Sequence, residues 1–194
     1  GNLVETAFLF MGLLSARQYF SRDTSLEKDL GARINALWRK IEWDSHLTPD
    51  GKNLQWLNHP ETGLGEWPVT GWNEAVVTHI MAAASPTHPV PDTVYKTGWS
   101  SGRDFYKNGE VRYDQSLALG PPGGGPLFFS HYSFLGIDPR GLKDANADYW
   151  QQNVAHTLIN RAYCVENLRA HKGYQANCWG LTASDNPEGY NVHK

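Results

Sequence analysis

The sequence predicts a mainly α-helical protein in which buried inner helices pair with amphipathic outer ones, as in a portion of an (α/α)6 toroid. Two patterns predict this class: residues 3–20 are apolar around the whole helix axis, and residues 26–41 carry one apolar stripe. In addition, the connecting segments are long, aromatic and rich in Gly and Pro, with a short β-hairpin as the exception. We expect residues 1–194 to form a single segment of a larger helical barrel.

The first two helices follow from local signals. Residues 3–20 predict a helix that is buried on nearly all sides, because no polar face interrupts the apolar positions. Thr24 and Glu27 stand three residues apart, which is the spacing of a capping box at the start of a second helix. The second helix is expected to lie outside the first, since its apolar residues form one stripe: Leu26, Leu30, Ile34, Leu37, Trp38 and Ile41.

A loop region and a third helix come next. Residues 44–70 contain turn signals such as Pro49-Asp50-Gly51 and are expected to be loops. The third helix is predicted from Trp72 to Ala84, where Ser85-Pro86 ends it.

The rest of the chain alternates between loops and helices. Residues 86–126 are expected to be mostly non-helical, because they contain prolines and a Gly-Gly-Gly run. A hairpin is predicted within residues 105–113, with its turn at Asn108-Gly109. Helices are predicted over residues 128–135 and 142–168, and residues 171–194 are expected to be loop. The last helix has an apolar stripe at helical spacing: Trp150, Val154, Leu158, Ala162 and Val165.

Composition excludes some classes of function. A net charge of −3 and a pI near 6.2 argue against nucleic acid as a partner, which clustered Lys and Arg would bind. Residues 6–14 are too few to span a membrane, and the N-terminal residues lack the pattern of a signal peptide. Eight Trp, nine Tyr and seven Phe favour a saccharide ligand, whose apolar faces stack on such rings; the alternative is that most of these rings pack the core.

Two carboxylates are the main catalytic candidates. Glu5 and Glu74 both fall near predicted helix N-termini, where an acidic side chain also stabilises the helix dipole without any catalytic role. The neighbours of Glu74 are Trp72, Asn73 and an apolar run. We expect this setting to desolvate the carboxyl group and raise its pKa, as a general acid requires.

The sequence carries no pattern for a bound metal or cofactor. Paired His residues at helical spacing and paired Cys residues at short separation are both missing, so no zinc site is expected. Gly120–Gly125 lacks the Lys of a phosphate-binding loop, and no nucleophile elbow occurs. Cys164 and Cys178 are expected to be free thiols.

Several segments, in order along nearly the whole chain, carry a family resemblance. The sequence resembles the bacterial glycoamylase-like family, which includes β-1,2-glucanases and a module of cyclic β-1,2-glucan synthases. The matching segments are residues 3–9 (LVETAFL), 71–74 (GWNE), 82–88 (AAASPTH), 125–136 (GPLFFSHYSFLG) and 179–185 (WGLTASD).

This resemblance implies a fold, an activity and a setting. It implies an (α/α)6 toroid that hydrolyses a β-glucan, with β-1,2 linkages, by inversion and without a cofactor. A periplasmic or secreted location is implied, and so are further helices that complete the barrel. Glu74 matches the family's proton-donor candidate and Glu5 another acidic position. Asn2 departs from the usual Asp, which indicates a sugar-binding role or a weakened catalyst.

The other candidate residues are assigned to the substrate. We expect Arg161 and Asn73 to donate hydrogen bonds to sugar hydroxyls, and Asp44 and Asp185 to compete with Glu5 as base, water-orienting or sugar-binding groups. The aromatic platform is expected to consist of Trp43, Trp72, His131, Tyr132 and Trp179. A non-catalytic glucan-binding module is the alternative, and a terpene-type cyclase is disfavoured because its Asp-rich run is missing.

Overall fold

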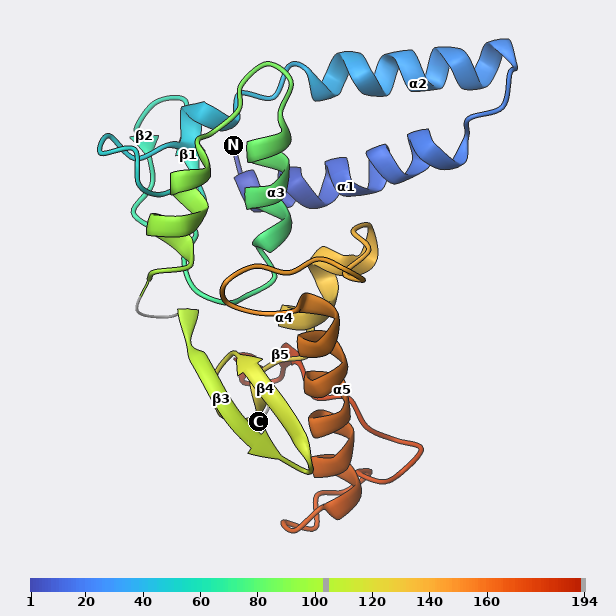
Figure 1. The fold of residues 1–194 in the computed structure, drawn as a ribbon, viewed down its shortest axis with the longest axis vertical. Helices are drawn as coiled ribbons and strands as arrows, with labels where there is room; N and C mark the ends of the chain where they lie inside the picture. Colours follow the sequence, from blue (N-terminus) through green and yellow to red (C-terminus); the bar gives the residue numbers. More distant parts are fainter. Residues whose placement is uncertain (103–104, 193–194) are drawn as a thin grey trace. The chain divides into compact units, whose positions relative to one another are not determined.

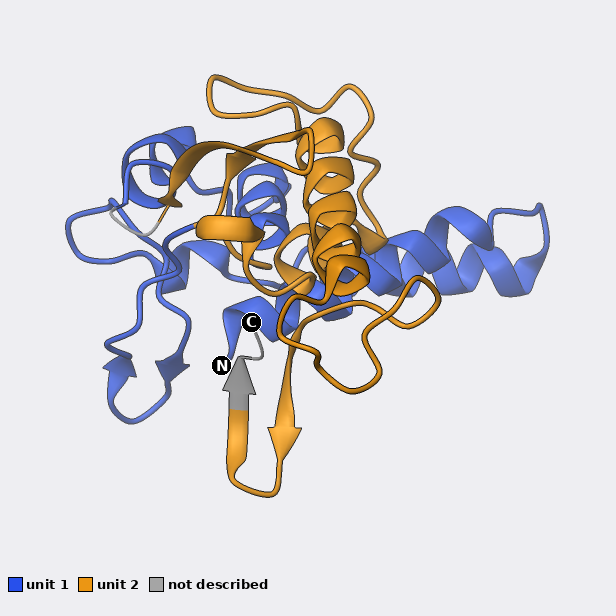
Figure 2. Cartoon of the chain, turned by 90° about the horizontal axis from the view of Figure 1, so that it is seen from below, with its two compact units in different colours: residues 1–71, 75–102 blue, residues 72–74, 103–194 orange. Residues whose placement is uncertain are grey.

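The computed structural model describes residues 1–102 and 105–192, which are mainly helical with small two-stranded sheets (Figure 1). The predicted helical class is therefore confirmed. The chain divides into two compact units (Figure 2). Unit 1 consists of Gly1–Gly71 and Ala75–Gly102, and unit 2 consists of Trp72–Glu74 and Arg103–Lys194. A single domain over residues 1–194 stays a prediction, because two compact units can belong to one domain.

Helix α1 (Leu3–Tyr19) begins unit 1. Asn2 caps it, since the Asn2 side chain accepts a hydrogen bond from the Glu5 N–H at 3.2 Å. The prediction of burial on nearly all sides is wrong: Leu9 is 59% exposed and Tyr19 is 81% exposed. Helices α2 and α3 cover only part of α1, and its buried residues are Leu3, Val4, Ala7, Phe10 and Met11.

Helix α2 (Ser25–Trp38) confirms half of the predicted capping box. The Thr24 hydroxyl accepts a hydrogen bond from the Glu27 N–H at 3.2 Å. The Thr24 N–H, however, donates to the Arg22 carbonyl. Glu27 therefore binds Arg22 instead, and its carboxylate accepts hydrogen bonds from the Arg22 N–H and guanidinium, each at 2.6 Å.

Aromatic rings join the first helices of unit 1. Phe10 of α1 lies 5.8 Å from Trp38 of α2, between ring centroids, and Trp38 meets Trp43 edge-on at 5.7 Å. Trp43 begins a 3₁₀ helix, Trp43–His46, and is fully buried. This row of rings stabilises the α1–α2 pair by burying large apolar surfaces.

The predicted loop region of unit 1 is confirmed. It contains the short strands β1 (Asn58–His59) and β2 (Gly63–Leu64) and several isolated bridges. One bridge joins Asn2 to Leu57, and the Leu3 N–H donates to the Trp56 carbonyl at 2.9 Å. The loop therefore fixes the start of α1.

Helix α3 (Val76–Ala84) begins later than predicted. The prediction that it starts at Trp72 is wrong, because Trp72–Glu74 form a turn that belongs to unit 2. A π-helix, Val94–Trp99, also lies in the segment that we expected to be mostly non-helical. His79 of α3 packs against its Trp99 at 5.1 Å between centroids, and burial lowers the pKa of His79 to about 4.

The hairpin of unit 2 is present, but its turn is not the predicted one. Strands β3 (Lys107–Arg112) and β4 (Gln115–Leu119) turn at Tyr113-Asp114, and both of these residues have positive φ, as tight hairpin turns require. Asn108-Gly109 instead lies within β3, where the strand register shifts. Its positive-φ Gly therefore serves a bulge.

The helices of unit 2 are shorter than predicted, and its tail contains strands. Residues 128–135 form helix α4 (Phe128–His131) and a 3₁₀ helix, Tyr132–Leu135. Helix α5 (Tyr149–Glu166) begins after Asp148, whose side chain accepts a hydrogen bond from the Gln151 N–H at 3.1 Å. The tail was expected to be loop throughout. It contains instead a hairpin of β5 (Ala183–Asn186) and β6 (Gly189–Val192).

Three buried polar side chains follow one another at four-residue spacing on α5. We call Gln152, His156 and Asn160 the α5 polar row. Gln152 pairs with the backbone of β4: its Oε1 accepts from the Leu119 N–H, and its Nε2 donates to the Leu119 carbonyl, both at 2.9 Å. Asn160 accepts from the Leu181 N–H at 2.9 Å.

His156 is the centre of the row and holds the segment Gly120–Gly125, which we call the Gly-rich loop. Its Nε2 lies 2.9 Å from the Gly125 carbonyl, which can only accept, so Nε2 carries the proton. Nδ1 therefore accepts from the Ser130 hydroxyl at 2.8 Å. A Cβ on Gly124 would lie 2.2 Å from the imidazole ring, so only Gly fits at that position.

The pairing of Gln152 gives a stability prediction. Gln152→Leu removes both hydrogen bonds and leaves the buried Leu119 N–H and carbonyl without their partner. We expect the free energy of unfolding to fall by about 2–4 kcal/mol. Gln151→Leu, on the exposed side of the same helix, is the matched control and should change it by less than about 0.5 kcal/mol. Equal effects of the two variants in denaturant unfolding would contradict the role of Gln152.

The buried imidazole of His156 gives a pH prediction. Burial lowers the pKa of His156 to about 4, below the usual 6.5. Between these values the unfolded chain binds a proton that the folded chain does not, so acid favours unfolding. From about pH 7 to about pH 5, His156 alone should lower the free energy of unfolding by about 2 kcal/mol. His156→Gln should show a correspondingly smaller fall, and an unchanged fall would refute this assignment.

Candidate functional site

The candidate residues from the sequence fall in both units. Four lie in unit 1: Asn2, Glu5, Trp43 and Asp44. Eight lie in unit 2: Trp72, Asn73, Glu74, His131, Tyr132, Arg161, Trp179 and Asp185.

In unit 1, the start of α1 brings Asn2 and Glu5 together. Asn2 is half-buried, and its side-chain oxygen is occupied by the Glu5 N–H as a helix cap. The Thr6 hydroxyl donates to the Asn2 carbonyl at 2.7 Å and fixes the same turn. Glu5 is exposed in the first turn of α1. A water-accessible carboxylate at this place suits both a stabilising role at the helix dipole and contact with a solvent-borne ligand.

Trp43 and Asp44 are adjacent in the 3₁₀ helix but differ in exposure. The Trp43 ring is fully buried, which disfavours its predicted role as a stacking platform for sugar. Asp44 is exposed, and a carboxylate oxygen lies 3.3 Å from His88 Nδ1. Of this pair, only Asp44 can reach a ligand.

In unit 2, the Trp72–Glu74 turn is anchored at both ends. The ring of Trp72 is 3% exposed and stacks on Tyr149 of α5, with 5.8 Å between centroids and 29° between planes. The Ser133 hydroxyl donates to the Glu74 carbonyl. Asn73 and Glu74 are half-buried. Trp72 therefore positions the turn, and its burial disfavours the stacking role predicted for it.

Gly120 completes the packing around Trp72. It has positive φ, and a Cβ there would lie 3.3 Å from Trp72 Cδ1. The Gly-rich loop thus approaches the indole closely because it lacks a side chain at this point. Sequence reasoning missed Ser133 as an anchor, although Ser133 lies within the segment 125–136 that carries the family resemblance.

His131 and Tyr132 lie where α4 passes into the 3₁₀ helix. The Thr157 hydroxyl donates to the Asn153 carbonyl at 2.7 Å, so the His131 Nε2 at 2.9 Å donates its proton to Thr157. Burial lowers the pKa of His131. Tyr132 is 48% exposed and retains ring surface for a ligand.

An apolar groove of about 460 Å³ runs beside His131. Trp150 of α5, which is 43% exposed, contributes an indole that is not among the candidate residues from the sequence. In the sequence, Trp150 is part of the apolar stripe of this helix. The groove is lined by Ser130, His131, Phe134, Leu135, Pro139, Trp150, Asn153, Val154, Thr157 and Leu158.

The remaining candidates lie on α5 and in the tail of unit 2. Arg161 is exposed on α5. Trp179 is 39% exposed in the segment before β5, next to Cys178, which pairs with Gln175 through two backbone hydrogen bonds of 3.0 Å. Asp185 is exposed on β5, opposite Tyr190 of β6. All three candidates are open to solvent.

Three further findings concern the cysteines, the length of the helices and possible metal ligands. Cys164 and Cys178 are free, as predicted. No helix among residues 1–102 and 105–192 is long and apolar enough to cross a membrane. Within the same described residues, no group of three or more His, Cys, Asp or Glu side chains could hold a metal ion.

The described residues define a mainly helical domain whose candidate residues are carboxylates, amides and aromatic rings. The family model Glycoamylase, described as "Putative glucoamylase", matches residues 66–194. The chain therefore belongs to the glycoamylase family, as its resemblance implied.

Similar proteins are known from sequence and from structure. The chain is 37% identical, over 95% of its length, to the exo β-1,2-glucooligosaccharide sophorohydrolase (non-reducing end) of Parabacteroides distasonis. It superposes over its whole length on an endo-β-1,2-glucanase from Chitinophaga pinensis, solved with sophorotriose and glucose, at TM-score 0.90 and 46% identity. A β-1,2-glucanase from Parabacteroides distasonis gives TM-score 0.93 and 36% identity.

The chain covers only part of each relative. It spans 28% of the sophorohydrolase, 47% of the Chitinophaga enzyme and 30% of the Parabacteroides glucanase structure.

Proposed function

We propose that this chain is part of a glycoside hydrolase that cleaves β-1,2-linked glucan with inversion. The observation that carries the proposal is similarity along 95–100% of the chain to proteins named as β-1,2-glucan hydrolases. We further propose that the enzyme is periplasmic or secreted, as the family resemblance implies, and that its partner is an oligosaccharide or polysaccharide.

In this mechanism Glu74 is the general acid. Its turn is fixed through the Trp72–Tyr149 stack and the Ser133 hydrogen bond, and a fixed backbone limits the positions that the carboxyl group can take. A positioned acid protonates the glycosidic oxygen as the bond to the sugar breaks. Its half-buried setting also restricts water around the reacting group.

Inversion needs a base that activates water on the other face of the sugar. In inverting enzymes the two carboxyl groups stand roughly 6.5–9.5 Å apart. Glu5, Asp44 and Asp185 compete for this role or for orienting the water and the sugar, and each is exposed and therefore reachable by water. Asn2 cannot act as a base, since an amide does not take a proton from water.

The substrate contacts follow from exposure. Tyr132 and Trp179 keep enough free ring surface to stack on a sugar, and His131, at the end of α4, directly precedes Tyr132. Asn73 and Arg161 carry N–H groups that suit sugar hydroxyls. Trp43 and Trp72 contribute through packing, because their rings are buried.

We also propose that further helices of the same barrel cover the apolar stripe of α5, within an (α/α)6 toroid. Trp150, Leu158 and Val165 of this stripe are 41–45% exposed, whereas the polar row of the same helix is buried. An exposed apolar stripe of this kind is typical of a surface that another element covers.

A non-catalytic glucan-binding module is the second candidate function. Asn2 favours it, because this position departs from the Asp that the family resemblance leads us to expect. A binding module would retain the aromatic and amide contacts while releasing no sugar.

Substitution of Glu74 tests the catalytic proposal. Glu74→Gln keeps the size of the side chain but cannot donate a proton usefully, so turnover should fall by at least about 10³-fold. Binding of oligosaccharide, measured by calorimetry, should change little. The readout is reducing sugar released from linear β-1,2-glucan by the full-length protein. Glu61→Gln, at an exposed loop position, is the control and should keep full turnover. Undiminished turnover in Glu74→Gln removes Glu74 from the role, and no turnover in the unmodified protein, with retained binding, supports the module.

Substitution of Asn2 separates its two roles. Asn2→Asp keeps an oxygen that caps the Glu5 N–H, so we expect unchanged or slightly increased stability. If the amide weakens catalysis, kcat should rise about tenfold or more with a similar KM. An unchanged kcat together with a higher KM would assign position 2 to sugar binding and contradict the expectation.

A further inference from the structure

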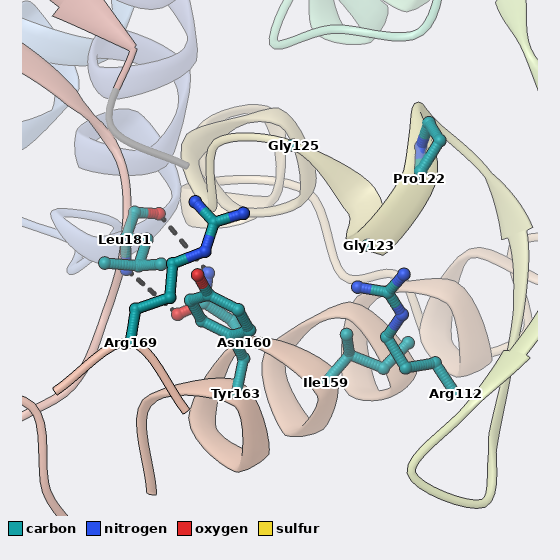
Figure 3. Close-up of a pocket in the computed structure, with 9 residues that line it drawn as sticks. All are labelled: Arg112, Pro122, Gly123, Gly125, Ile159, Asn160, Tyr163, Arg169 and Leu181. Carbon is teal, nitrogen blue, oxygen red and sulfur yellow. Dashed lines mark hydrogen bonds between the residues drawn. The ribbon is translucent and has the colours of Figure 1, made fainter. Parts of the chain in front are cut away.

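A small pocket in unit 2 has a distinctly cationic lining. It has a volume of about 180 Å³ and lies between the C-terminal half of α5, the Gly-rich loop and Leu181 (Figure 3). Arg112 and Arg169 contribute their guanidinium groups, and no acidic side chain is among the lining residues described. Figure 3 shows the two guanidinium groups on opposite sides of the pocket. Ile159 and Leu181 form an apolar part of the lining.

Hydrogen bonds hold the Arg112 wall of the pocket. Arg112 Nε donates to Glu110 Oε1 at 2.8 Å. The other Glu110 oxygen accepts from the Gly123 N–H at 2.9 Å, which ties the Gly-rich loop to the same carboxylate. The ion pair with Glu110 uses Nε of Arg112. Nη1 of the same guanidinium lies close to Gly123, since a Cβ added to Gly123 would be 3.4 Å from it. Arg112 is thus held with its terminal N–H groups toward the pocket.

The opposite wall is built on α5 and the tail. Asn160 accepts from the Leu181 N–H, and the Leu181 carbonyl accepts from Leu127, so this part of the wall is fixed. Tyr163, one turn after Ile159, adds a phenol beside Arg169 (Figure 3). The phenol and the guanidinium can both donate to an anion.

We infer that this pocket binds a phosphate group, either as the free ion or as the end of a small phosphate ester. Two guanidinium groups on opposite sides match a tetrahedral anion, which carries about −1.5 to −2 charges at neutral pH and has several acceptor oxygens. A single carboxylate offers only two oxygens on one side. The apolar part of the lining, Ile159 and Leu181, suits a few carbon atoms of an ester. A neutral sugar brings no negative charge to Arg169 or to the terminal N–H groups of Arg112, whose Nε is paired with Glu110, so this pocket is distinct in its chemistry from a glucan site.

Calorimetry with inorganic phosphate tests this inference on the full-length protein in a chloride buffer of constant ionic strength. We expect saturable binding, weakened at least about tenfold by Arg169→Gln and by Arg112→Gln. Arg169 lies exposed in a loop, so a folding defect would not explain its effect. Arg140→Gln is the control, because Arg140 is an exposed arginine of the same unit paired with Asp138, and it should bind phosphate within about twofold of the unmodified protein.

Other ligands distinguish the source of the phosphate group. Tighter binding of glycerol 3-phosphate than of inorganic phosphate identifies an ester, and the reverse identifies the free ion. The inference is overturned if phosphate gives no binding heat, if both arginine variants bind as well as the control, or if succinate or glucose binds more tightly than either phosphate compound.

Discussion

The α5 polar row is the interaction on which unit 2 depends. A two-stranded sheet is marginal by itself, and the hairpins of unit 2 have only two strands each. The α5 polar row takes the place of further strands. Its side chains form hydrogen bonds with the backbone of β4, of the Gly-rich loop and of the segment before β5. Without these side chains, each buried backbone group left unpaired would lower the free energy of unfolding by about 1–3 kcal/mol. One helix therefore organises three segments that are far apart in sequence.

The same arrangement explains how α5 divides its two faces. Its polar row is buried because each member has a backbone partner, and Leu117, Ala155 and Ile159 pack beside it as the local core. The apolar stripe is left toward solvent. A hydrophobic pattern alone would place the apolar stripe toward the core. That rule fails for α5, because its buried amides and imidazole pair with backbone groups as a neighbouring strand would. The four-residue spacing of the row was visible in the sequence, but its partners were not.

Local rules predicted what depends on local interactions. The range of α1 followed from its apolar pattern and the start of α2 from Thr24, and both helices lie close to their predicted ranges. The turn predicted at Asn108-Gly109 was wrong, because a Gly with positive φ occurs in bulges as well as in turns. Only the pairing of β3 with β4 decides between the two. The start of α3 was wrong because Trp72 is drawn into contact with Tyr149, far along the chain. Motifs located candidate site residues, yet the burial of Trp43 and Trp72 depends on neighbours that no motif contains.

The excursion of Trp72–Glu74 into unit 2 has a consequence for dissecting the protein. The chain passes between the units after residues 71, 74 and 102, so neither unit is one continuous stretch. A polypeptide beginning after Gly102 would lack Trp72, and the face of Tyr149 would lose the indole that covers it. Two polypeptides cut at Gly102 and produced separately should consequently be less stable than the same residues in one chain. Circular permutation or grafting of the tail region onto another scaffold would need to carry that tripeptide along.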